Sequence, residues 1–188
     1  MALRVTSEAG AVISLDEVKR HLRVDYSDDD MYIDTLIATA ASWIGGDSGW
    51  LGISLGVQTW EMTLDAFPAE RITIPLPPLV SVDGIEYVDI NGETQQYTGF
   101  RVFGLGSKES GLVLPAYGQV WPTSRDEPEA VKIAFTAGSE TVDQAIKHAM
   151  LLLISGWYET REPPAEKPPS EIPFGVTALL LPQRNWSA

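Results

Sequence analysis

The chain has 188 residues, of which 44% are hydrophobic and 21% are charged, a composition typical of folded globular proteins that excludes disorder of the whole chain. Its 26 acidic residues outnumber 13 basic ones, so the protein as a whole repels nucleic acid phosphates and is not expected to bind DNA specifically. The sequence has no cysteine and only two histidines, which excludes disulfide scaffolds, thiol nucleophiles and histidine-rich metal sites, and we expect neither a cofactor nor a metal.

The N-terminal part, 1–56, is predicted to be helical. Ser14 followed three residues later by Glu17 is a capping box, and a second start signal stands at Ser27, before three aspartates that the helix dipole favours in a first turn. Gly45 and Gly46 are expected to end the second helix. Its apolar face is expected to consist of Ile33, Leu36, Ile37, Ala40 and Ile44. Arg4 and Glu8 interrupt any apolar run at the N-terminus, and no segment of the chain has the length and hydrophobicity of a membrane span.

The middle part, 57–138, is predicted to be an antiparallel β section. Hydrophobic and polar residues alternate there with a period of two, as in Trp60, Met62 and Leu64, and turn-forming residues separate the alternating runs. Asn91-Gly92 between two such runs is the clearest hairpin signal.

The C-terminal part is predicted to contain one long helix, a linker and a tail. A second capping box begins at Thr141, and 139–162 is expected to be a helix that completes the helical core. The segment 163–173 holds five prolines and is interpreted as an exposed, semi-rigid linker. The segment 174–188 is interpreted as a docking tail. The fold class is therefore α+β, with N-terminal helices and a long C-terminal helix forming one core and an antiparallel β section between them.

Several residues invite a chemical interpretation, and each also has a structural one that we favour. The aspartates after Ser27 lack the spacing of a calcium loop, and His21 and His148 lack any partner motif of a hydrolase or metalloenzyme. The 104–108 segment, Gly-Leu-Gly-Ser-Lys, resembles a phosphate-binding loop but fails its spacing. Trp60, Trp121 and Trp157 could form a sugar platform, although core packing is favoured. The sequence thus presents no catalytic constellation, and we expect the protein not to be an enzyme.

An ordered set of motifs resembles the head-to-tail connector (adaptor) proteins of tailed bacteriophages, over about residues 13–184. The motifs are Leu15-x-x-Val18-Lys19-x-His21-Leu22-Arg23-Val24-Asp25 with Asp28-Asp29-Asp30, Gln58-Thr59-Trp60, Phe67-Pro68, Leu76-x-Pro78-Leu79-x-Ser81-Val82, Tyr87-x-Asp89, Trp121-Pro122, Phe135-Thr136-Ala137-Gly138, Ile146-Lys147-x-Ala149, Trp157-Tyr158-Glu159-x-Arg161-Glu162 and Leu179-Leu180-x-Pro182-x-Arg184.

This resemblance implies a structural protein of a virion or phage-like particle neck, assembled in the bacterial host cytoplasm. It implies a ring of about twelve copies that joins the portal protein to a tail-side connector or stopper protein, with DNA passing through but not specifically bound. It also implies that the tail faces the portal. The residues expected to make that contact are Val176, Leu179, Leu180, Leu181, Arg184 and Trp186.

Alternatives to these interpretations stay open at this point. The tail could instead fold back onto its own subunit and complete the core. The protein could be a β-rich carbohydrate- or receptor-binding module, which exposed Trp60 and Trp121 would favour. It could also be an enzyme with a carboxylate pair of raised pKa in a cleft.

Overall fold

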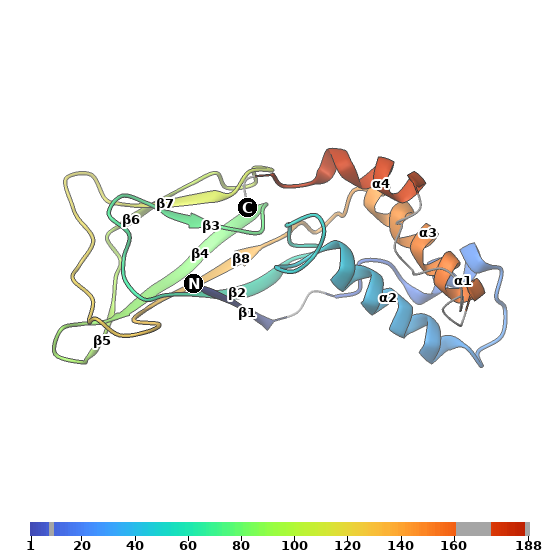
Figure 1. Cartoon of the computed structure of the whole chain (residues 1–188), viewed down its shortest axis with the longest axis horizontal. Coiled ribbons are helices and arrows are strands. Elements are labelled where there is room, and N and C mark those ends of the chain that lie inside the picture. Colours follow the sequence, from blue (N-terminus) through green and yellow to red (C-terminus); the bar gives the residue numbers. More distant parts are fainter. Residues whose placement is uncertain (8–9, 161–173, 187–188) are drawn as a thin grey trace.

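The computed structural model describes residues 1–7, 10–160 and 174–186, which form an elongated molecule with helices at one end and strands at the other (Figure 1). The predicted linker at 163–173 lies outside the described residues. The helices are α1 (Leu15–Leu22), α2 (Asp30–Ile44), α3 (Gln144–Thr160), α4 (Phe174–Leu180) and the short 3-10 helix η1 (Leu181–Gln183). The strands are β1 (Ala2–Ser7), β2 (Gln58–Leu64), β3 (Ile72–Ile74), β4 (Leu79–Val88), β5 (Thr94–Gln96), β6 (Phe100–Phe103), β7 (Gly111–Pro115) and β8 (Val131–Ala137).

The helical end is held together by one hydrophobic cluster to which α1, α2, α3 and α4 all contribute. The apolar face predicted for the second helix is the buried face of α2, from Ile33 to Ile44. In α3, Ile146, Met150 and Ile154 are buried at helical spacing and pack against it. This arrangement confirms a helical core built from segments at both ends of the chain.

The helix starts follow local hydrogen bonding, which shifts two of them from their predicted positions. The Ser14 hydroxyl accepts from the backbone N–H of Glu17 at 3.2 Å, as a capping residue does, and α1 starts where predicted. At Ser27 it is instead the backbone carbonyl oxygen that accepts from the Asp30 N–H, in a turn that precedes the helix, so α2 begins at Asp30. The N-terminal cap of α3 comes from Asp143, whose carboxylate accepts from the backbone N–H of Ala145 at 2.8 Å, and not from Thr141.

The β end consists of two antiparallel sheets that pack face to face. The larger sheet has the order β1-β2-β8-β4-β5, and the smaller has the order β3-β7-β6. Every pairing between these strands is antiparallel, and the Asn91-Gly92 turn joins β4 to β5 as predicted. Trp60, Ile133 and Phe135 are buried in the cluster between the sheets. The predicted α+β class with an antiparallel β section is therefore confirmed.

The strand β1 was not predicted from the sequence. It lies within 1–56, which we expected to be helical, and it pairs with β2 from Ala2↔Thr63 to Ser7↔Thr59 as the edge of the larger sheet. Only Leu3 and Val5 of this strand are half-buried, so its alternation is too short to stand out in the sequence. The chain consequently starts in the β end, crosses to the helices, returns to the sheets and crosses again.

Candidate partner-binding surface

The first half of the predicted docking tail packs on its own subunit. Val176 and Leu180 in α4 are fully buried in the hydrophobic cluster of the helical end, and Leu179 is half-buried against the same cluster. These three side chains lie at helical spacing on one face of α4, which rests on α3. A truncation that removed 174–188 would therefore expose part of the helical core, so it cannot separate folding from partner binding.

The second half of the tail presents apolar and aromatic surface to solvent. Leu181 is 46% exposed and Trp186 is 71% exposed. The Arg184 guanidinium lies over two indole rings, 4.9 Å from the centroid of Trp50 and 4.7 Å from that of Trp186. Such cation–π contacts pre-organise the arginine and the exposed tryptophan, and these two residue types are enriched at energetically important positions of interfaces.

Hydrogen bonds hold this second half across the waist between the helical and β ends. The Asn185 backbone N–H donates to the Leu51 carbonyl at 2.8 Å, and the Gln183 amide donates to the Asp143 carboxylate at 3.3 Å. From the β side, the Lys108 ammonium donates to the Gln183 side-chain oxygen at 3.3 Å. We call residues 181–186 the waist segment, because they contact both ends of the molecule.

Sequence reasoning found the tail residues but missed their partners. Trp50, Leu51 and Lys108 lie far from the tail in the sequence, and no motif signals that they meet it. The six predicted tail residues divide into two groups. Val176, Leu179 and Leu180 anchor the tail on its own helices, whereas Leu181, Arg184 and Trp186 lie at the surface or border it.

The residues that could have supported other functions are engaged in structural roles. Trp60 is buried, and the Trp121 ring stacks on Phe67 with centroids 5.0 Å apart while its indole N–H donates to the Glu70 carbonyl. Trp157 is half-buried against the helical core. Neither Trp60 nor Trp121 is therefore displayed as a sugar platform would require.

The carboxyl group of Asp89 lacks the raised pKa of a general acid. Backbone N–H groups of Glu93 and Asn91 donate to the Asp89 carboxylate and hold its pKa below the ordinary value, whereas a general acid needs a raised pKa. These bonds stabilise the turn between β4 and β5. Across the described ranges 1–7, 10–160 and 174–186, the side chains of His, Asp and Glu form no group of three that could hold a metal ion.

The tip of the helical end carries a tyrosine–aspartate cluster instead. The Tyr158 hydroxyl donates to the Asp29 carboxylate at 2.5 Å, and Tyr26 contacts both groups at 3.1 Å. The hydrogen bonds to Tyr158 and then to Asp29 raise the pKa of Tyr26 to about 12. Nearby, Lys19 forms an ion pair with Asp30 at 2.5 Å. The aspartates predicted to start the second helix thus join α1, α2 and α3 at this tip.

We expect Tyr158→Phe to lower the pKa of Tyr26 from about 12 toward the ordinary tyrosine value, because it removes the hydrogen bond that raises this pKa the most. Tyrosine absorbance during an alkaline titration, or the NMR shifts of the Tyr26 ring, measures this change. Tyr117→Phe, at an exposed position in the β end, is the matched control and should leave the Tyr26 titration unchanged. A Tyr26 pKa that stays at about 12 in Tyr158→Phe would contradict the assignment.

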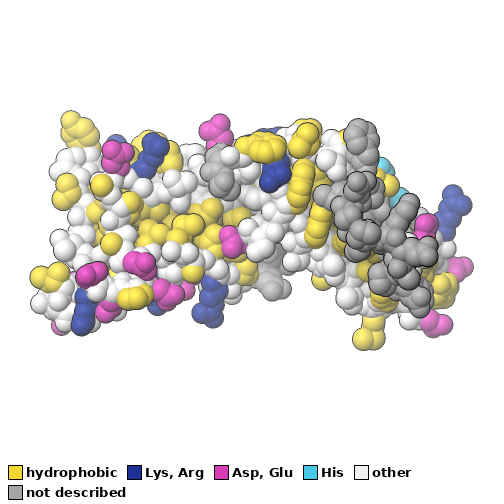
Figure 2. Space-filling view, viewed as in Figure 1, with side chains coloured by type: hydrophobic (Ala, Val, Ile, Leu, Met, Phe, Trp, Pro, Cys, Tyr) yellow, Lys and Arg dark blue, Asp and Glu magenta, His cyan; other side chains and the backbone are white. Residues whose placement is uncertain are grey.

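Exposed apolar side chains also occur far from the tail. Tyr117 is 92% exposed and Val120 is 83% exposed in the loop between β7 and β8, and Ile90 is 70% exposed beside the β4–β5 turn. Apolar side chains are visible on the face of the β end shown in Figure 2, with acidic side chains along its lower rim. None of the described helices is both long and apolar enough to cross a membrane.

The comparison with protein families decides what kind of protein has this surface. The model of the family described as "Head completion protein" matches residues 11–163, which is most of the chain. The chain belongs to the head completion protein family. This membership confirms the resemblance to phage head-to-tail connectors that the sequence motifs indicated. A search of curated proteins found no match.

Solved structures with the same fold come from phage-like particles. The chain is similar, with a TM-score of 0.80 and 22% identity, to a chain in the neck of an empty gene transfer agent (GTA) particle computed with C6 symmetry. The similarity covers 100% of this chain and 97% of the other. A chain of the native GTA neck computed with C12 symmetry gives a TM-score of 0.73, with the same identity and coverage. This head completion family member thus shares its whole fold with neck proteins.

Proposed function

We propose that this protein is a non-catalytic neck component of a tailed phage or phage-like particle, where it forms a ring that joins the portal to the tail. Membership of the head completion family carries the proposal, and the fold shared with chains of six-fold and twelve-fold symmetric necks supports the ring. The particle neck is the corresponding location. The tail side of the ring would contact a connector or stopper protein.

The charge of the chain suits the passage of DNA through such a ring. The chain has 26 acidic and 13 basic residues, and a channel wall rich in carboxylates repels phosphates. DNA would therefore pass through the ring without adhering to it.

The waist segment is the part of the tail that we assign to the portal contact. Leu181 and Trp186 are exposed in the subunit, and the stacked Arg184 borders them. A single small contact of this kind binds weakly, because the entropy lost when side chains are ordered and translation is restricted offsets most of the free energy gained from the buried area. In a ring of about twelve copies, each later contact is effectively intramolecular, so weak contacts combine into a durable joint.

The combined variant Leu181→Asp, Trp186→Ala tests this assignment. Both side chains are exposed, so we expect a folded protein whose attachment to portal-bearing heads falls at least tenfold, since the apolar contact is lost in every copy of the ring. Attachment is measured by co-sedimentation of the full-length protein with heads, and folding by circular dichroism.

Tyr117→Ala, which removes an exposed aromatic side chain from the β end, is the matched control and should attach like the wild type. Wild-type attachment by a folded Leu181→Asp, Trp186→Ala variant would exclude the waist segment as the portal contact. If wild-type protein neither attaches to heads nor forms rings in electron micrographs, the proposed function itself is wrong.

A further inference from the structure

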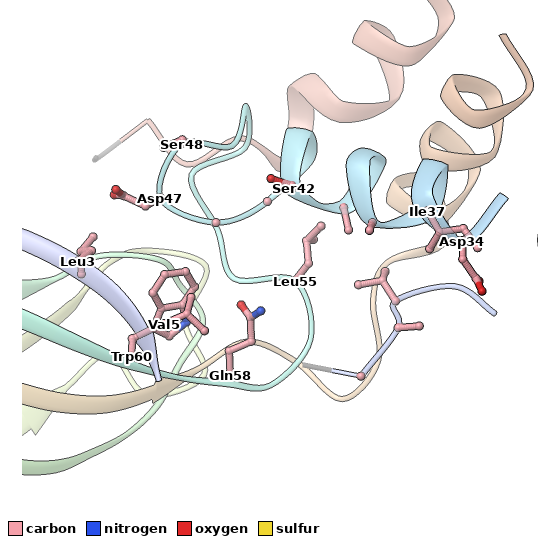
Figure 3. A pocket seen from close by; sticks show the side chains of 17 residues that line it. Leu3, Val5, Asp34, Ile37, Ser42, Asp47, Ser48, Leu55, Gln58 and Trp60 are labelled. Carbon is pink, nitrogen blue, oxygen red and sulfur yellow. The ribbon is translucent and has the colours of Figure 1, made fainter. Parts of the chain in front are cut away.

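A groove of about 700 Å³ lies between the edge strand β1, the start of β2 and helix α2. Figure 3 shows side chains from both ends of the molecule around one space, with Leu3, Val5 and Trp60 on the sheet side and Ile37 on α2. Small residues of α2, such as Ala38 and Ala41, leave room on the helix side. The groove is therefore suited to an apolar side chain from a partner.

The charged groups that line this groove are acidic. Asp34 lies on α2 and Asp47 in the loop that follows it; both are exposed, and the residues lining the groove include no lysine, arginine or histidine. Figure 3 places both carboxylates at the border of the space. A complementary occupant would thus combine an apolar side chain with a nearby cation.

A segment with these two features lies on the other side of the same waist. In the 104–108 loop, Leu105 is 55% exposed and Lys108 is exposed as well. Leu55 lines the groove and also lines a second hollow, which Lys108 borders. Figure 1 shows the connection between β6 and β7, which carries this loop, along the edge of the molecule opposite to β1 and α2, which border the groove, so the two lie on different sides of one subunit.

The loop has a fixed shape that presents Leu105 outward. Gly104 and Gly106 flank this leucine with φ angles of 79° and 68°, which glycine adopts readily. The Gly106 N–H donates to the Leu79 carbonyl at 2.8 Å, and the Ser107 N–H donates to the Gly104 carbonyl at 3.2 Å. A loop held in this way loses little conformational entropy when it binds.

We propose that the groove of one subunit receives the 104–108 loop of the next subunit in the ring. Leu105 enters the apolar space, and the Lys108 ammonium, which donates to the Gln183 side chain within the isolated subunit, turns to Asp47 at the border of the groove. Contacts between two different faces of identical subunits are heterologous, and they generate closed rings when the rotation between neighbours closes. This inference rests on the proposed function, since it names the residues through which the ring is built.

Cysteine cross-linking tests the pairing directly, because the natural sequence contains no cysteine. In full-length protein carrying Ala38→Cys and Leu105→Cys together, mixed with portal protein, we expect a short bis-maleimide to produce a ladder of cross-linked species that ends at the ring. Either substitution alone should give no ladder. The pair Ala38→Cys with Thr73→Cys, whose second site is exposed on β3, is the matched control and should also give none.

A second variant measures the strength of the contact. Leu105→Asp should raise the protein concentration required for ring assembly, measured by native mass spectrometry, at least tenfold. Tyr117→Asp, at another exposed loop position, is the control and should leave that concentration unchanged. Rings that assemble normally in Leu105→Asp, or that form without any ladder from the cysteine pair, would overturn this inference and leave the proposed function standing. Absence of rings and of portal attachment in the wild type would overturn both.

Discussion

Gly138→Ala should lower the free energy of unfolding by about 3 kcal/mol or more. Gly138 has a φ of +113°, a conformation that side-chain-bearing residues rarely adopt, and a Cβ atom there would lie well inside 3.0 Å of the Gly56 carbonyl oxygen. Its N–H also donates to the Pro78 carbonyl at 2.8 Å, so the backbone cannot shift freely to relieve the clash. Urea denaturation followed by circular dichroism gives the change in unfolding free energy.

Gly118→Ala separates strain in the backbone from the steric clash. Gly118 has a φ of +76°, but no atom lies within 4 Å of a Cβ built on it. We expect this variant to lose only about 1 kcal/mol, which is the cost of a positive φ alone. Equal losses of unfolding free energy in Gly138→Ala and Gly118→Ala would show that the close approach of Gly138 to the Gly56 carbonyl does not add to the cost.

Leu180→Ala should lower the free energy of unfolding by about 2 to 5 kcal/mol. The side chain is fully buried among α3 and its neighbours, so truncation leaves a cavity in the helical core. Leu181→Ala, one residue later and 46% exposed, is the matched control and should change stability by less than about 0.5 kcal/mol. Thermal or urea unfolding of the full-length chain compares the two.

These two leucines also test how the tail divides between folding and binding. If Leu180→Ala is as stable as the wild type, α4 is not an integral part of the helical core, and the whole tail becomes available to a partner. If Leu181→Ala is as destabilised as Leu180→Ala, the waist segment contributes to the core and its exposed area is a poor candidate for the portal contact.

The sequence predicts those elements of the fold that local chemistry determines. Ser14 caps α1 because its hydroxyl accepts from the backbone N–H of Glu17, three residues later. This hydrogen bond is local and does not depend on the rest of the chain. Asn91-Gly92 forms its turn because Gly92 readily adopts a φ of 88°. The start of α3 was misplaced by the same kind of argument, since Thr141 and Asp143 are both acceptable caps. The Asp143 carboxylate makes the capping hydrogen bond, whereas the Thr141 backbone is bonded to the Ser139 hydroxyl.

The parts that depend on distant pairing could not be derived in this way. β1 is a strand because β2 offers it an edge, and its own six residues carry only two half-buried side chains. The spacing of apolar residues in 174–188 indicated that one face of this segment would be apolar. It did not indicate that α3 of the same subunit would cover that face. The groove likewise arises from β1, α2 and the 45–58 connection coming together, and no segment alone predicts it.

The hydrogen bonds across the waist determine how the molecule can respond to a pulling force. The chain crosses the waist between β1 and α1, again at 45–57 and again at 138–143. In the second crossing the Ser54 N–H donates to the Pro77 carbonyl at 3.2 Å, and at the start of the third the Gly138 N–H donates to the Pro78 carbonyl. The waist segment adds a further link, because Asn185 bonds to Leu51 on one side and to Ser110 on the other. Load applied between the two ends would be shared among these parallel links, so we expect the subunit to transmit tension without bending at the waist.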